Sequence, residues 1–345
     1  MNFASDNTAG AHPDILDAIV QANTGQTMPY GNDEVTARVR DRVCEVFETD
    51  ARIFFVPTGT AANGLAIAAI TPPWGAVVCH EKAHIYDHEC NGPATFAGGA
   101  RLIGLPGEFG KIAPEDIELV TLEGRGDEHY SQVRAVSVTQ LTEQGTAYGL
   151  DELAAIGDVC RKHSLYLHMD GSRFANAVAH VGCSAADMSW KAGVDVLSFG
   201  GTKNGALALD AVVFFNPALG DDFLYRQKRA GHVLSKMRMM SAQMEAYLNE
   251  DLWLRNARHA NAMARRLADG LSDLDVELVS PVHGNQIFPL MPPDMVETLK
   301  NAGIQFYDRG PVGGDDERRK VRLVTAFNTP TADVDTFLET AALTD

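Results

Sequence analysis

Short apolar runs rich in β-branched residues alternate with helical patterns over the first two thirds of this chain. Buried strands are predicted at residues 53–56, 76–79, 135–138, 165–168, 194–198 and 211–215. Helices are predicted between several of these runs, at residues 32–48, 61–70, 151–163 and 185–192. This alternation is typical of an α/β domain built on a mostly parallel sheet.

The remainder of the chain predicts a second, smaller domain. Residues 221–266 carry a long helical pattern, and short strands and helices return from about residue 277. A chain of 345 residues has the length of a two-domain protein. We expect an N-terminal segment and a large domain over residues 1–240, and a small C-terminal α+β domain over residues 241–345.

Charge and composition exclude several classes of function. The 46 acidic and 29 basic residues give a net charge of −17, which repels nucleic acid and anionic lipid, so neither is expected as a partner. No apolar segment is long enough to span a bilayer, and the first residues lack a secretory pattern, so a cytoplasmic protein is expected. Five scattered cysteines without a Cys-x-x-Cys pair indicate neither a disulfide framework nor a structural metal site.

Two of the predicted strands end in residues that can carry chemistry. One ends in Asp170, followed by Gly171, Ser172 and Arg173, and the other leads into a glycine-rich turn that carries Lys203. The separation of 33 residues (203 minus 170) fits one strand–helix–strand crossover. Both side chains are therefore expected at the carboxyl edge of the sheet, where α/β domains bind ligands.

An acid and a lysine in this arrangement match the needs of pyridoxal 5′-phosphate (PLP). A lysine forms the Schiff base, and a carboxylate keeps the pyridine nitrogen protonated. Asp-Gly is also a common turn, and a lone lysine is usually a solvated charge, but the two segments together favour the cofactor. His168, on the same strand face as Asp170, is either a partner of that acid or a core histidine.

A third segment predicts a site for the cofactor phosphate. The strand at residues 53–56 runs into Gly59 and Thr60 and then an alanine-rich helix. Backbone N–H groups and the dipole at a helix N-terminus bind phosphate, although Gly-Thr is also an ordinary strand-to-helix turn.

The chain resembles the β-eliminating lyase and threonine aldolase family over nearly its whole length. The resemblance rests on the motifs Ala4-Ser-Asp-Asn7, Tyr30-Gly-Asn-Asp33, Gly59-Thr60, Ala83-His-Ile-Tyr-Asp-His-Glu89, His168-Met-Asp-Gly-Ser-Arg173, Gly201-Thr-Lys203 and Val321-Arg-Leu-Val-Thr325. It implies the PLP-dependent transferase-like fold (fold type I), with a mostly parallel seven-stranded sheet. The Ser5-Asp-Asn7 opening and the Gly-Gly-Thr-Lys-Asn-Gly turn are closest to the low-specificity L-threonine and phenylserine aldolases.

The resemblance also implies roles for individual residues. His84 would stack on the pyridine ring and His129 would lie near the substrate hydroxyl, although an exposed loop histidine is the alternative for His129. The base that takes the hydroxyl proton would be His84, His129 or a water that they position. Arg322 and Ser5 would bind the substrate carboxylate, and Arg173 would lie near the cofactor or the same carboxylate.

The expected reaction is the cleavage of L-threonine, L-allo-threonine or L-phenylserine to glycine and an aldehyde. The expected partner is therefore a small amino acid, within a homodimer or homotetramer whose sites lie at subunit interfaces. Arg238 is expected to complete a neighbouring subunit's phosphate site, with a solvated helix face as the alternative. A β-elimination, a transamination or a non-catalytic PLP-binding role would use the same cofactor residues.

Overall fold

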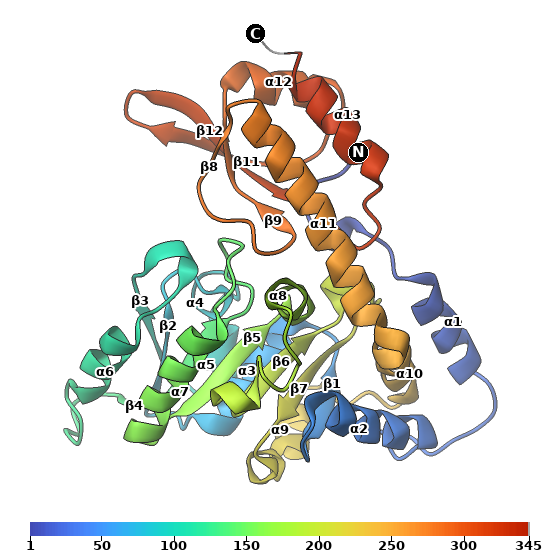
Figure 1. The fold of residues 1–345 in the computed structure, drawn as a ribbon. Helices are drawn as coiled ribbons and strands as arrows, with labels where there is room; N and C mark the ends of the chain where they lie inside the picture. Colours follow the sequence, from blue (N-terminus) through green and yellow to red (C-terminus); the bar gives the residue numbers. More distant parts are fainter. Residues whose placement is uncertain (344–345) are drawn as a thin grey trace.

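The computed structural model describes residues 1–343, which form a large and a small sheet connected by helices (Figure 1). The large sheet has seven strands in the order β1-β7-β6-β5-β4-β2-β3. Its strands are β1 (Arg52–Val56), β2 (Gly75–His80), β3 (Arg101–Leu105), β4 (Gln132–Thr139), β5 (Tyr166–Gly171), β6 (Val196–Gly200) and β7 (Asp210–Phe214). Only β7 runs antiparallel to its neighbours, so the expected mostly parallel seven-stranded sheet is confirmed.

Helices cover both faces of the large sheet because neighbouring residues of each strand point to opposite sides. Val77 and Val212 face one buried cluster, which contains α3, and Val78 and Val213 face the other, which contains α2, α7, α8 and α10. The helices of this part are α1 (Pro13–Ala22), α2 (Glu34–Phe47), α3 (Gly59–Ile70), α4 (His84–Asp87), α5 (Gly92–Phe96), α6 (Pro114–Leu122), α7 (Leu150–His163), α8 (Phe174–Val181), α9 (Phe223–Arg229) and α10 (Arg238–Leu248).

The small sheet is antiparallel and is joined to the large one by the long helix α11 (Figure 1). Its strands are β8 (Glu277–Leu278), β9 (Gln286–Ile287), β10 (Pro289–Met291), β11 (Tyr307–Gly313) and β12 (Asp316–Val324). Its helices are α11 (Leu252–Asp273), α12 (Pro293–Asn301) and α13 (Thr331–Ala341). The N-terminal residues return to this sheet, because the Phe3 N–H donates to Gln305 at 2.8 Å and the Phe3 carbonyl accepts from Val324 at 2.8 Å.

The structure differs from the sequence-based expectations in three places. Strand β3 was not among the predicted runs. The helix predicted at residues 185–192 is a series of turns ending in a 3₁₀ helix (Trp190–Ala192), because the Ser189 hydroxyl donates to the Ala185 carbonyl at 2.6 Å and the Ser189 backbone is not helical. The long helical pattern at 221–266 is divided into α9, α10 and α11, and Gly231, with a φ of +81°, lies in the first break.

The expected domain division at residues 240 and 241 falls inside α10, which packs against α1 and α2 of the large part. All strands of the small sheet follow it in the chain. Within residues 1–343, no helix has the length and hydropathy needed to cross a membrane.

Candidate active site

Lys203 lies in a one-turn 3₁₀ helix (Thr202–Asn204) just beyond the carboxyl end of β6. Asp170 is near the end of the neighbouring parallel strand β5, where it pairs with Ser198. The prediction that both residues lie at the carboxyl edge of the sheet is therefore confirmed. In residues 1–343 the Lys203 amine makes no hydrogen bond or ion pair with another residue, so it is available to react.

The Asp170 carboxylate is almost completely buried, at 1% exposure, and is held by several donors. Ser172 donates its N–H (3.0 Å) and its hydroxyl (2.8 Å) to Oδ1 of Asp170, and Asn63 Nδ2 donates to Oδ2 at 2.9 Å. Burial by itself would raise the pKa of Asp170. The positive charges of His84 and Lys203, together with the Ser172 hydrogen bonds, outweigh burial and leave this pKa below its ordinary value. Asp170 is therefore an anion at neutral pH.

A chain of side chains connects Asp170 to His84. Asn63, on the buried helix α3, donates through Nδ2 both to Asp170 and to Oε1 of Glu89, the latter at 2.7 Å. Nδ1 of His84 lies 2.8 Å from the same Glu89 oxygen, so the Nδ1 hydrogen points at Glu89. This hydrogen bond raises the pKa of His84 above its ordinary value, against the opposing effect of burial. Nε2 makes no hydrogen bond within residues 1–343, and the side chain is 34% exposed.

The first turn of α3 has free backbone donors. Thr58 caps this helix by accepting from the Ala61 N–H at 3.2 Å. The N–H groups of Gly59 and Thr60 make no hydrogen bond within residues 1–343. A Cβ added to Gly59 would meet only the Ser172 hydroxyl, at 3.7 Å, so open space lies next to these donors. A phosphate group is the kind of ligand that such a helix start binds.

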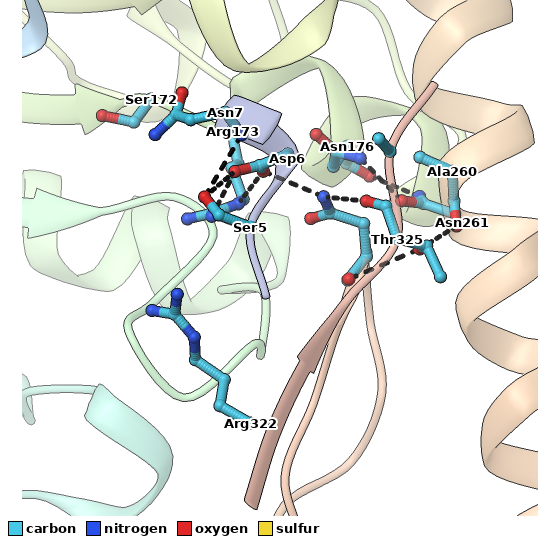
Figure 2. Close-up of polar contacts among 12 residues, drawn as sticks. Ser5, Asp6, Asn7, Ser172, Arg173, Asn176, Ala260, Asn261, Arg322 and Thr325 are labelled. Carbon is cyan, nitrogen blue, oxygen red and sulfur yellow. Dashed lines mark hydrogen bonds and ion pairs between the residues drawn. The ribbon is translucent and has the colours of Figure 1, made fainter. Parts of the chain in front are cut away.

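Arg173 is paired with an acid of the N-terminal segment (Figure 2). Its Nε and Nη2 donate to Asp6 at 2.9 and 3.1 Å, and both residues are less than 10% exposed. Asn285 also donates to Asp6, at 3.0 Å. The guanidinium of Arg173 is thus already neutralised by a carboxylate of the protein.

Arg322 has no such carboxylate. It extends from β12 toward the N-terminal segment that carries Ser5 (Figure 2). Its Nη2 donates to the carbonyl of Ala4, the residue before Ser5, at 3.0 Å. Its Nε is buried and has no hydrogen-bond partner. Burial and the charge of Arg173 lower the pKa of Arg322. An anionic ligand would satisfy the unpaired Nε and the charge.

Two of the expected site residues do not lie with the others in this chain. His129 is in the exposed loop before β4, at the amino edge of the sheet, whereas Lys203 and Asp170 are at the carboxyl edge. Arg238 is half-buried, and its Nη1 donates to the Thr24 carbonyl at 3.2 Å. The open alternatives for His168 are resolved in favour of a core histidine. It bonds to Ser137 and Ser198, and burial lowers its pKa to about 4.

The sequence-based interpretation missed three residues of this cluster. Asn63 was detectable as a polar residue within an alanine-rich buried helix. Asp6 lies inside the Ser5-Asp-Asn7 motif, but the resemblance assigned a role only to Ser5. Glu143 follows the carboxyl end of β4, and its charge contributes to the raised pKa of His84 and partly opposes the lowering of the pKa of Arg322. Its position at a strand end was the available signal.

The residues at this edge fit PLP. Lys203 offers a free amine, Asp170 a buried anion, and Gly59 and Thr60 unpaired phosphate donors. Buried atoms without partners, Oε2 of Glu89 among them, also border the cluster. No group of three or more His, Cys, Asp or Glu side chains in the described residues could hold a metal ion.

Comparisons with known proteins agree with this arrangement. The sequence matches the beta-eliminating lyase family over residues 2–292. It is 46% identical to the low specificity L-threonine aldolase of Pseudomonas aeruginosa, with 88% of each chain covered, and 44% identical to that of a Pseudomonas species, with 94% of this chain and 96% of the relative covered. The solved structure of the Leishmania major threonine aldolase superimposes with a TM-score of 0.94 at 30% identity, covering 99% of this chain and 98% of the other. From the match over most of its length, the chain belongs to the PLP-dependent beta-eliminating lyase family.

Proposed function

We propose that this protein is a PLP-dependent aldehyde-lyase that cleaves L-threonine, L-allo-threonine and related β-hydroxy-α-amino acids such as L-phenylserine to glycine and an aldehyde. The observation that carries the proposal is the joint presence of a free lysine and a buried anionic Asp170 at the carboxyl edge of the large sheet, together with Arg322 of β12, whose buried Nε has no hydrogen-bond partner. The names of the Pseudomonas and Leishmania relatives support the reaction.

Bound PLP supplies a ring that accepts the electrons left on the substrate Cα when the Cα–Cβ bond breaks. Lys203 is the residue that would hold the cofactor, through its amine. Asp170 keeps a proton on the ring nitrogen, because it is buried and anionic. Gly59 and Thr60 bind the phosphate through backbone N–H groups.

Arg322 binds the substrate α-carboxylate, with the Ser5 hydroxyl beside it. The guanidinium can hold a carboxylate through two parallel hydrogen bonds, and its unpaired Nε is one of the required donors. Arg173 contributes positive charge but is committed to Asp6. This grip on the carboxylate fixes the orientation of the Cα–Cβ bond relative to the ring.

His84 takes the proton of the β-hydroxyl through Nε2. Glu89 holds Nδ1 and so leaves Nε2 as the basic atom of the neutral ring. The raised pKa of His84 means that a larger share of the imidazole is protonated near neutral pH, so activity should rise with pH through that pKa. His129 has no part in this step within one chain, since it lies at the opposite edge of the sheet.

The same cofactor residues would serve a β-elimination, a transamination or a non-catalytic PLP-binding protein. A coupled assay for aldehyde release from L-threonine, L-allo-threonine and L-phenylserine separates these reactions. We expect aldehyde in proportion to glycine, and loss of this activity in Lys203→Ala. Lys320→Ala, which removes an exposed lysine of β12, is the matched control and should keep full activity. If none of the three substrates gives an aldehyde, the proposal is refuted.

We further propose a cytoplasmic homodimer or homotetramer with small amino acids as its partners and active sites at the subunit interface. The exposed apolar side chains of Val20 (69%) and Met28 (67%), near the Thr24 carbonyl that Arg238 contacts, support an interface on this face. In such an assembly Arg238 would reach a neighbouring subunit's phosphate. Sedimentation of the wild type and of Met28→Asp tests this arrangement.

A further inference from the structure

The turn that carries Lys203 is the connection between the antiparallel strands β6 and β7. Gly200, the last residue of β6, pairs with Asp210, the first residue of β7, so Asp210 lies at the base of this turn. The Asp210 side chain is 7% exposed and belongs to none of the motifs on which the family resemblance rests. The reaction described above therefore does not explain why a buried carboxylate lies at this position.

Asp210 binds the two residues immediately before the lysine. Oδ1 accepts from the Gly201 N–H at 3.2 Å, and Oδ2 accepts from the Thr202 hydroxyl at 3.3 Å. The same hydroxyl accepts from the Leu209 N–H at 3.0 Å, which ties the start of the turn to its end. The Leu209 carbonyl also accepts from the Gly201 N–H at 3.1 Å and lies 3.2 Å from the Thr202 hydroxyl, so it holds the start of the turn together with the Asp210 carboxylate.

Neutral groups fix the C-terminal side of the turn. Asn204 donates through Nδ2 to the Tyr247 hydroxyl at 2.7 Å and to the Trp253 carbonyl at 2.8 Å. The Asn204 carbonyl in turn accepts from Asn256 at 2.9 Å. These contacts hold the turn without using the Lys203 side chain. Neutral side chains could also have held the N-terminal side of the turn, so the buried charge of Asp210 calls for a separate explanation.

The charge of Asp210 has no ion-pair partner within residues 1–343. The ionisable groups that face it are Lys203 on the turn, Asp170 on β5 and Tyr247 on α10. Burial raises the pKa of Asp210 to about 7, and Lys203, its facing cation, acts in the opposite direction. The buried negative charge of Asp210 is therefore unfavourable by itself, and a positive charge at the Lys203 nitrogen stabilises it.

We propose that Asp210 is a positioning residue for Lys203, which fixes the start of the lysine turn and places a negative charge that favours the cationic state of the lysine nitrogen once the cofactor is bound. The inference rests on the proposed function only in that Lys203 carries PLP. It adds to that function a charged residue that acts through the lysine and does not touch the substrate.

The test is a pH titration of the visible absorbance band of the PLP-loaded protein, which reports protonation at the lysine–cofactor link. In Asp210→Asn, a substitution of nearly the same shape, the midpoint should fall by about one pH unit, the size of shift that a nearby opposite charge produces. Asp210→Glu, which keeps the charge, should hold the wild-type midpoint. An Asp210→Asn midpoint equal to that of the wild type overturns the proposal.

Thr202→Val separates the charge from the shape of the turn, because it removes the hydroxyl that bonds to Asp210 but keeps the carboxylate. It should weaken PLP binding in equilibrium dialysis without moving the midpoint. A Thr202→Val midpoint shifted as far as that of Asp210→Asn would make the effect one of turn geometry and refute the role of charge. If Asp210→Asn does not fold, a shifted midpoint in Asp210→Glu overturns the proposal instead. Failure of the proposed function itself is distinguishable, because the wild type would then show no lysine–cofactor band.

Discussion

Asp6→Asn should destabilise the protein through the buried ion pair with Arg173. Asp6 accepts two hydrogen bonds from Arg173, one from Asn285 and a longer one from the Ser5 hydroxyl, and an asparagine would turn an NH₂ group toward at least one of these donors. The Arg173 guanidinium, 7% exposed, would keep its charge and lose its counterion. The substitution therefore leaves a buried cation uncompensated.

The loss should be about 3–5 kcal/mol of the free energy of unfolding, the cost of removing one partner of a buried pair. The effect should also depend on pH. Burial acts to raise the pKa of Asp6, but Arg173, Lys203 and the Asn285 hydrogen bond outweigh it and leave this pKa below its ordinary value. The ionised carboxylate thus stabilises the wild type above about pH 4, and this contribution disappears as the pH falls through the lowered pKa.

Urea unfolding followed by circular dichroism, at fixed protein concentration, measures the difference. Asp221→Asn is the matched control, because Asp221 pairs with Arg52 on the surface and its side chain is 74% exposed. Loss of that exposed pair should change the unfolding free energy by only about 0–1 kcal/mol. Equal, small losses in the two variants at pH 7 would refute the reasoning that Asp6→Asn leaves the buried charge of Arg173 uncompensated.

Three further predictions concern the site. Arg322→Gln should raise the KM for L-threonine by about 10- to 100-fold with a smaller change in kcat, since it removes a charged hydrogen bond to the carboxylate; an unchanged KM in steady-state assays would count against this contact. Glu89→Gln should move the acidic limb of the kcat/KM profile to lower pH, because the Glu89 hydrogen bond raises the pKa of His84, which must be neutral to accept a proton; a limb that stays in place would exclude His84 as the titrating base. In the apoprotein, Asp210→Asn should gain thermal stability relative to the wild type as the pH rises from 4 to above 7, because the raised pKa of Asp210 makes its ionised form unfavourable in the fold; a constant difference in Tm across this range would contradict the burial argument.

The parts of the fold and site that the sequence predicted are those fixed by strand periodicity. Asp170 and Lys203 follow buried apolar runs, and the carboxyl ends of neighbouring parallel strands must meet at one edge. The expected helix at residues 185–192 failed for a local reason, the competition of the Ser189 hydroxyl for a backbone carbonyl.

Other parts depend on contacts that no local pattern encodes. Asp6 pairs with Arg173, which is 167 residues away in the sequence. Asn63 contacts Glu89 and Asp170 from α3, a helix that is apolar on all sides, so its sequence does not indicate which way the Asn63 side chain points. His129 was assigned its role by resemblance alone, and the topology places its loop before β4, at the amino edge of the sheet. Strand-end reasoning applied to β4 would have pointed to Glu143 instead.

Reduction of the PLP-loaded protein with borohydride, followed by peptide mass spectrometry, tests the central claim most directly. Borohydride converts the lysine–cofactor link into a stable bond, so the modified residue can be read from the peptide. We predict the pyridoxyl mass on the peptide that contains Lys203, with loss of the aldehyde-releasing activity in the same sample. Modification of a different lysine, or full activity after modification of Lys203, would contradict this account.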